Sequence, residues 1–230
     1  MSDKPFSIAI DGPAGAGKTS VSKAVAAELN IMYLDTGAMY RAFGLYMLRK
    51  GGTSDTKAII AALDEVDISV KFVDGVQRMY LGDEDVTDAI RTPEVSMAGS
   101  DVAAVPEVRE RMVALQRKIA EGHSVIMEGR DIGTKVLPNA TLKIYMTASL
   151  EERARRRWRE MEQKGKPEPY EKVIREMEER DYQDTHRAAS PLRAADDAIT
   201  LDNTHLSFDE NVAVVKRLAL EAIQKQNYKS

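Results

Sequence analysis

A run of glycines followed by a lysine and a threonine is the first feature of the sequence that could do chemistry. Residues 12–19, GPAGAGKT, satisfy the pattern GxxxxGK[ST] between a predicted strand and a predicted helix. Backbone N–H groups that turn inward, and the partial positive charge of the helix N-terminus, predict a cradle for nucleotide phosphates. The alternative is a tight glycine turn that caps a helix and binds nothing. The predicted cradle comprises Gly12, Pro13, Ala14, Gly15, Ala16, Gly17, Lys18, Thr19 and Ser20.

Within this cradle, Lys18 and the hydroxyl residues after it have separate expected roles. We expect the Lys18 ammonium group to reach the β- and γ-phosphates of the nucleotide. Mg²⁺ prefers oxygen ligands and shares them with phosphates, so a hydroxyl group at this point predicts a contact with the metal. Thr19 is favoured for that contact, and Ser20 is the alternative.

Arginines form the second set of candidates. A phosphoryl transfer to an acceptor that is itself phosphorylated brings two anions together, and catalysis then depends on cations that spread the charge. The sequence has no NKxD motif of the kind that recognises guanine, which weakens a GTPase interpretation. The candidate arginines are Arg41, Arg130, Arg153, Arg157, Arg180 and Arg187.

The segment 151–159, EERARRRWR, predicts a charged helix. Spacing by four residues pairs Glu151 with Arg155 and Glu152 with Arg156, whereas Arg153 and Arg157 have no acidic residue at i+4. Two adjacent guanidinium groups without local partners predict an external anion. The alternative is a solvated helix face whose arginines serve solubility.

A second predicted helix carries charge where an apolar stripe would continue. Val173 and Met177 define the stripe, and Arg180, Asp184 and Arg187 follow at helical spacing on the side expected to face inward. We interpret these three residues as part of a site. Surface ion pairs between Asp184 and the two arginines are the alternative, and each would contribute less than about 1 kcal/mol.

The elements that must position these side chains alternate between strand and helix. Strands are predicted at 6–10, 125–127, 142–146 and 198–201, and helices after the glycine turn, from Pro106 and from Ser207. This alternation predicts an α/β fold with a parallel sheet flanked by helices. Two segments interrupt it: a β-hairpin around Asp74 and Gly75, and a pair of charged helices that starts with a capping box at Ser149 and Glu152.

Composition excludes several other classes of protein. The 230 residues are 43% hydrophobic and 30% charged, which is typical of a globular protein. Without cysteine there is no disulfide, thiolate metal site or cysteine nucleophile. The net charge of −4 and the absence of a long apolar run argue against a general nucleic-acid binder or a membrane protein, and we expect a cytoplasmic enzyme.

Four motifs together resemble the bacterial-type cytidylate kinases of the nucleoside-monophosphate kinase family, across nearly the whole chain. They are the 12–19 loop, DTGAMYR at 35–41, EGRDIG at 128–133, and the ERD and RAASPL segments at 179–181 and 187–192. The resemblance implies a P-loop NTPase-type sheet with a small β-containing monophosphate-binding insertion and a helical lid. It implies a core at 1–35, 100–148 and 186–230, an insertion at 36–99 and a lid at 149–185.

The resemblance also implies a reaction, in which ATP with Mg²⁺ phosphorylates CMP or dCMP in a monomeric enzyme. Arg41 and Arg130 would bind the acceptor phosphate, and Ser100, Arg109 and Asp131 would recognise cytosine. Arg180, Asp184 and Arg187 would contact sugar and phosphates, while Lys18, Arg153, Arg157 and Arg187 would be catalytic. Further substrate-binding candidates are Thr36, Tyr40 and Gly129.

Two alternative functions and the role of one residue remain open from the sequence. Another P-loop kinase of a small acceptor, such as UMP or shikimate, would share most of these motifs. A non-catalytic, nucleotide-dependent binding module is less favoured, because the arginine-rich segment contains only Trp158 as a stacking aromatic. The role of Glu128 also stays open between a water-mediated metal contact and a simple acidic residue at the end of a strand.

Overall fold

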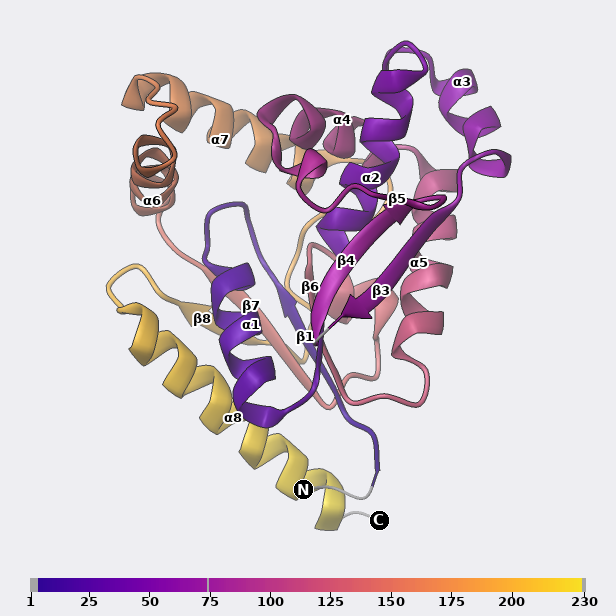
Figure 1. Ribbon diagram of the computed structural model, residues 1–230. Coiled ribbons are helices and arrows are strands. Elements are labelled where there is room, and N and C mark those ends of the chain that lie inside the picture. The colour runs from indigo at the N-terminus through magenta and orange to yellow at the C-terminus, as the bar shows by residue number, and fades with distance from the viewer. Residues whose placement is uncertain (1–3, 74, 229–230) are drawn as a thin grey trace. The chain divides into compact units, whose positions relative to one another are not determined.

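The computed structural model describes residues 4–73 and 75–228 of the chain (Figure 1). The chain folds into two compact units. The first unit contains the described residues of Met1–Ile31 and Ser124–Ser230, and the second unit is Met32–His123. Each unit has its own helices and strands.

The first unit is built on parallel strands. β6 (Val125–Gly129), β1 (Ser7–Asp11), β7 (Leu142–Thr147) and β8 (Ile199–Asp202) lie side by side in this order. All three pairings are parallel, as the alternating sequence pattern predicted. The apolar residues inside β1 are fully buried, as expected for a strand covered on both faces.

Helices and loops follow the carboxyl ends of these strands. α1 (Lys18–Leu29) packs against β1 and β6, and α8 (Phe208–Tyr228) packs against β7 and against α1 (Figure 1). In α/β sheets, ligands bind outside the carboxyl ends of the strands. The parallel arrangement therefore brings the 12–17 loop, the turn after β6 and the loop after β8 to one edge of the sheet.

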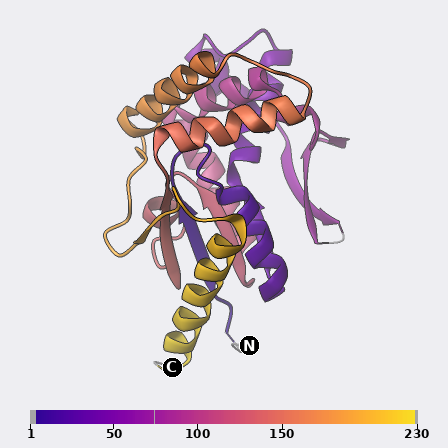
Figure 2. The ribbon, with the colours of Figure 1, turned by 90° about the vertical axis from the view of Figure 1, so that its left-hand side faces the viewer.

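Two charged helices, α6 (Leu150–Gln163) and α7 (Tyr170–His186), form an adjacent pair in the first unit (Figure 2). The predicted cap of α6 is confirmed, because the Ser149 hydroxyl accepts a hydrogen bond from the Glu152 N–H at 3.2 Å. The Trp158 ring packs edge-on against Tyr170, with 6.4 Å between ring centroids, and its Nε1 donates to the Glu168 carbonyl oxygen. These contacts fix the two helices to each other through apolar and polar groups.

The second unit combines helices with a small antiparallel sheet. Its helices are α2 (Thr36–Arg49), α3 (Thr56–Ala61), α4 (Pro93–Ala103) and α5 (Pro106–Ala120), with short 3₁₀ turns at Ala62–Asp64 and Ala89–Arg91. The small sheet consists of β3 (Ile68–Val73), β4 (Val76–Leu81) and β5 (Glu84–Asp85), in this order. The unit also contains the strand β2 (Met32–Asp35). The predicted hairpin is confirmed by the antiparallel β3–β4 pairing, although residue 74 of its turn lies outside the described residues.

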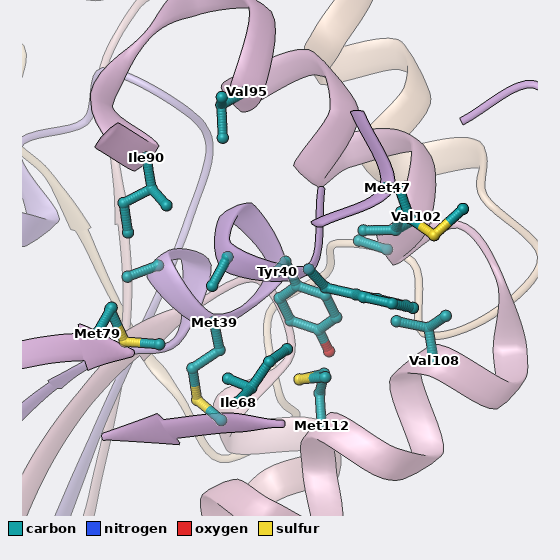
Figure 3. Packing of buried hydrophobic residues seen from close by; sticks show 14 of the residues in the cluster. Met39, Tyr40, Met47, Ile68, Met79, Ile90, Val95, Val102, Val108 and Met112 are labelled. Atoms are coloured by element: carbon teal, nitrogen blue, oxygen red, sulfur yellow. The ribbon is translucent and has the colours of Figure 1, made fainter. Parts of the chain in front are cut away.

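The core of the second unit is rich in methionine and lies around α2 (Figure 3). Met39 and Tyr40 of α2 are buried there with Ile68 of β3 and Met112 of α5. α2 and α4 approach closely at Gly44, where an added Cβ atom would lie 2.6 Å from the Gly99 nitrogen. Arg41 lies in the same contact, because an added Cβ atom at Gly99 of α4 would lie 3.0 Å from Arg41 Cγ.

The predicted division into core, insertion and lid stays a prediction at the proposed boundaries. Within residues 4–73 and 75–228, no helix has the length and apolar character needed to cross a membrane.

Candidate active site

The loop between β1 and α1 has the conformation that the glycine pattern requires. Gly12 has a φ angle of 151°, and a Cβ atom there would lie 1.9 Å from the Met146 carbonyl oxygen of β7. Only glycine fits this approach of two backbones. Gly17 caps α1 without a side-chain hydrogen bond, so the first N–H groups of the helix are left for another acceptor.

Lys18 is buried under this loop. Its Nζ donates a hydrogen bond of 2.7 Å to the Pro13 carbonyl oxygen, across the loop. Burial, together with the positive charge of Arg130, lowers the pKa of Lys18 to about 7, although Glu128 and Asp184 act in the opposite direction. A nucleotide phosphate in the loop would restore the positive charge, because an anion nearby favours the protonated amine.

Three predicted residues of the first unit form one cluster. Arg130 Nε donates to Asp184 Oδ2 at 2.7 Å, and Arg187 Nη1 lies 3.5 Å from Asp184 Oδ1. Burial alone would raise the pKa of Asp184, but Arg130, Arg187 and Arg180 outweigh burial and lower it. Three guanidinium groups therefore act on the one buried carboxylate of Asp184, while Glu128 and Asp181 also act on Arg130.

Asp11 at the end of β1 also contributes to this region, although it was not among the residues predicted from the sequence. Its two carboxylate oxygens accept hydrogen bonds of 2.7 Å from the N–H groups of Ile132 and Gly133. Asp11 thus fixes the turn that follows Arg130 and contains Asp131. Burial raises the pKa of Asp11 to about 6 despite these hydrogen bonds. The sequence did contain a signal for Asp11, because it is an acidic residue directly before the glycine loop.

The expectation that two arginines of α6 lack protein partners is wrong. Arg157 Nη1 lies 3.0 Å from Glu160 Oε2, because a pairing at i+3 replaces the missing pairing at i+4. Arg153 is buried and pairs with Asp181 of α7 at 2.6 Å, and it also donates to the Ala14 carbonyl oxygen of the loop. These contacts fasten α6 to α7 and to the loop.

The other two predicted pairings of α6 have different outcomes. Arg156 pairs with Glu152 at 3.0 Å, which confirms that prediction. Arg155 pairs with Glu152 at 3.2 Å instead of with the predicted Glu151. Glu152 therefore serves both arginines from one turn away, at i+3 and i+4.

In the second unit, Asp35 positions Arg41. Asp35 caps α2 by accepting the Ala38 N–H at 2.9 Å, and its Oδ2 lies 2.8 Å from Arg41 Nη2 and 3.3 Å from Arg91 Nη1. Burial opposes ionisation of Asp35, but the two arginines and the helix N–H lower its pKa. The buried Nε of Arg41 has no hydrogen-bond partner among the described residues, so this guanidinium keeps a donor for a ligand.

The remaining predicted residues lie in two places. In the second unit, Arg109 of α5 is buried with its guanidinium carbon 5.4 Å from the ring centroid of Tyr40, and it donates to the Ala103 carbonyl oxygen. Thr36 begins α2, and Ser100 is half-buried on α4. Asp131 is buried in the first unit beside Gly129 and Arg130. The assignment of Ser100, Arg109 and Asp131 to one base stays a prediction.

Comparisons with known proteins agree with these motifs. A sequence profile described as cytidylate kinase matches residues 8–221 of the chain. The chain belongs to the cytidylate kinase family. A protein named cytidylate kinase from Caldicellulosiruptor bescii is 49% identical over 224 residues, which cover 97% of this chain and 99% of that protein. Another protein of that name, from Streptococcus sanguinis, is also 49% identical, over 96% of this chain and 100% of the other.

Several solved structures are similar in fold to this member of the cytidylate kinase family at low sequence identity. A shikimate kinase from Bacteroides thetaiotaomicron is 13% identical, with a TM-score of 0.47 and coverage of 94% of this chain and 98% of that one. Similarity at this level bears on neither substrate nor mechanism.

The oxygen groups beside the loop fit a Mg²⁺ ion. Thr19 is half-buried in the first turn of α1, and Glu128 is buried at the end of β6, in register with Ile10 of β1. In the described part of the chain, no group of three His, Cys, Asp or Glu side chains could hold a metal ion by itself. This donor set suits a hard cation that takes most of its ligands from nucleotide phosphates and water.

Proposed function

We propose that this protein transfers the γ-phosphoryl group of ATP to CMP or dCMP, and so produces ADP with CDP or dCDP. Its place in the cytidylate kinase family supports this activity. The observation that carries the proposal is the cluster in the first unit, where Arg130 donates to Asp184 at 2.7 Å and Arg187 lies 3.5 Å from the same carboxylate. Guanidinium groups that are held in place in this way can stabilise the charge of a transferring phosphoryl group.

On the donor side, the loop would bind the ATP phosphates. The N–H groups of the loop and of the first turn of α1 donate to phosphate oxygens, and Lys18 adds a positive charge beside the β- and γ-phosphates. Thr19 and, through water, Glu128 would hold Mg²⁺. When bound, this ion neutralises phosphate charge and orients the β- and γ-phosphates.

On the acceptor side, Arg41 and Arg130 would bind the phosphate of the monophosphate, with Thr36, Tyr40 and Gly129 beside the substrate. Cytosine has an N4 amino donor next to the N3 and O2 acceptors. Oxygen atoms of Ser100 and Asp131 would accept the amino protons, and Arg109 would donate to the ring acceptors. Uracil reverses part of this pattern, so we expect it to be disfavoured by a large factor, up to about 10⁴-fold.

The reaction would be a direct in-line transfer. An oxygen of the acceptor phosphate attacks the γ-phosphorus, and the bond to the bridging oxygen of ADP breaks with its electron pair retained by ADP. The attacking oxygen is already ionised at neutral pH, so no general base and no covalent enzyme intermediate are needed. Arg187 would stabilise the charge on the transferring group, together with Arg157, while Arg180 and Asp184 would contact the sugar and phosphates.

Arg153 has a different role in this proposal from the one expected from the sequence. Its guanidinium is already used by Asp181 and by two backbone carbonyl oxygens, those of Ala148 and Ala14. We therefore assign it to holding α6 and α7 against the loop. A monomeric state, a cytoplasmic location and the absence of nucleic-acid partners stay predictions.

The experiment that tests this function measures ADP production from Mg-ATP with six acceptors: CMP, dCMP, UMP, AMP, GMP and shikimate. We expect fast turnover with CMP and dCMP, much slower turnover with UMP, and background rates with the other three. Turnover restricted to shikimate or to a purine nucleotide would contradict the proposed substrate. Nucleotide binding without ADP production from any acceptor would instead support a non-catalytic binding module.

A further inference from the structure

Three carbonyl oxygens of the 12–17 loop each accept a hydrogen bond from a side chain. Lys18 Nζ donates to Pro13 O at 2.7 Å, Arg153 Nη1 to Ala14 O at 3.1 Å, and Asn203 Nδ2 to Ala16 O at 2.8 Å. Two of these donors come from far along the chain. Asn203, which follows β8, is 187 residues from Ala16 and only 1% exposed.

The direction of a loop carbonyl determines the direction of the next N–H. In a trans peptide the C=O and N–H bonds point to opposite sides of the chain, and the described residues contain no cis peptide bond. When Asn203 holds the Ala16 carbonyl on its own side, the Gly17 N–H must point to the opposite side of the backbone. An N–H group that is held in one direction before the ligand arrives binds an anion without a cost of reorganisation.

The side-chain amide of Asn203 is itself held in one orientation. Its Oδ1 accepts from Arg156 Nη1 at 3.0 Å, and its backbone carbonyl oxygen accepts from Arg156 Nη2 at 2.8 Å. Arg156 Nε donates to Glu152 Oε1, and the Asn203 N–H donates to the Thr147 carbonyl oxygen. A guanidinium can only donate and a carbonyl can only accept, so these partners leave Nδ2 as the one group that can face Ala16 O.

We propose that Asn203 is a positioning residue for the donor phosphates, acting through the Ala16–Gly17 peptide, and that Arg156 orients it. The inference rests on the proposed binding of ATP phosphates in the loop. Asparagine suits this position because its side chain both accepts from Arg156 and donates to Ala16 O. An aspartate would face the carbonyl with an acceptor, and an alanine would leave that carbonyl without its donor.

The test compares Asn203→Ala with a matched control, Asn211→Ala. Asn211 is also buried after β8, and its Nδ2 donates to a backbone carbonyl oxygen, that of Ser207 at 2.9 Å, but not to the loop. Affinity is measured by calorimetry for ATP and for inorganic tripolyphosphate, which carries phosphates without a nucleoside. We expect Asn203→Ala to weaken both ligands by about tenfold relative to Asn211→Ala, as for the loss of a hydrogen bond next to charged groups.

Each other outcome contradicts the inference. Equal affinities in the two variants would show that Asn203 serves the fold alone. A loss confined to ATP, with tripolyphosphate unaffected, would mean that Asn203 contacts the nucleoside. If Asn203→Ala does not fold, Arg156→Gln removes the orienting guanidinium and should weaken tripolyphosphate by about threefold; no change would overturn the inference.

Lys18→Ala separates this inference from the proposed function. If Lys18→Ala leaves tripolyphosphate binding intact, the phosphates do not occupy the loop, and both proposals fail. If Lys18→Ala abolishes binding while Asn203→Ala matches its control, the proposed donor site stands and only the role of Asn203 is wrong.

Discussion

At the scale of single residues, the positive charge of this site depends on burial as well as on residue type. Lys18 lies under the loop beside Arg130, and their repulsion adds to the cost of burying the ammonium group. Arg130, Arg180 and Arg187 together lower the pKa of Asp184, while Glu128 and Asp181 also act on Arg130. An anion bound beside Lys18 would reduce the cost of burying its positive charge.

The lowered pKa of Lys18 predicts how stability varies with pH. Between pH 7 and its ordinary pKa of 10.5, the unfolded chain carries a proton on Lys18 that the folded chain has released. The contribution of Lys18 to the free energy of unfolding therefore increases as the pH rises from 7 to 10.5. Urea unfolding at several pH values should show this rise in the wild type, and Lys18→Met should remove it. An identical slope in both proteins would contradict the assigned shift.

The same shift predicts proton uptake when ATP binds. At pH 8 the free enzyme has Lys18 largely neutral, and the phosphates should draw up to about one proton onto it. Calorimetry of ATP binding in buffers with different ionisation enthalpies measures this uptake directly. Lys18→Met should reduce it, and wild-type uptake that matches the variant would exclude Lys18 as its source.

Arg187 is the arginine whose loss should reduce catalysis most clearly. Its Nε donates to the Ser190 carbonyl oxygen, and its Nη1 pairs with Asp184. By analogy with arginines that stabilise phosphoryl transfer, Arg187→Ala should lower kcat by about 10³ to 10⁵, or about 4 to 7 kcal/mol. Arg193→Ala is the control, since Arg193 is exposed and pairs with Asp196. Near-normal turnover of Arg187→Ala would remove Arg187 from the mechanism.

Sequence reasoning at this scale succeeded where a residue acts through its neighbours in the chain. The loop and Lys18 followed from one motif, because their geometry is local. Asn203 did not, because its partner Ala16 is set by the tertiary fold. The partner of Arg153 was missed for the same reason, since Asp181 lies on the next helix and no i+4 rule applies to it.

At the scale of elements, close contact between α2 and α4 positions Arg41. An added Cβ atom at Gly99 would lie 3.0 Å from Arg41 Cγ, and one at Gly44 would lie 2.6 Å from the Gly99 nitrogen. The two helices can touch there because neither position has a side chain. The sequence predicted neither contact, because both glycines lie inside helices, where their usual role in turns gives no signal.

Gly44→Ala should therefore push α2 and α4 apart. We expect a loss of stability of about 1 to 3 kcal/mol, as for an overpacked core, and a raised KM for CMP because Arg41 moves with α2. Thermal unfolding and steady-state kinetics measure the two effects. A variant with unchanged stability and unchanged KM would show that the helix contact does not position Arg41.

The order of elements was more predictable than their contacts. The parallel strands of the first unit and the β3–β4 hairpin of the second followed from periodicity and turn residues, and both are confirmed. The capping box at Ser149 predicted the start of α6 to the residue. These features depend on short segments, so one sequence was sufficient to find them.

At the scale of the whole molecule, the chain has a net charge of −4 but concentrates cations at the candidate site. Glutamates and aspartates outnumber basic residues overall, 37 to 33, while three arginines act on the buried carboxylate of Asp184. The overall charge argues against a general nucleic-acid or membrane-surface binder, which stays a prediction, and only the local pattern indicated a phosphate site.

The central claim is that one chain holds a donor and an acceptor nucleotide together for direct transfer. The measurement that tests it most directly is calorimetric binding of a bisubstrate analogue, adenosine and cytidine joined through five phosphates. We predict one analogue per chain, bound far more tightly than ATP or CMP alone, with binding weakened by both Lys18→Ala and Arg41→Ala. Binding no tighter than ATP, or unaffected by Arg41→Ala, would contradict the claim.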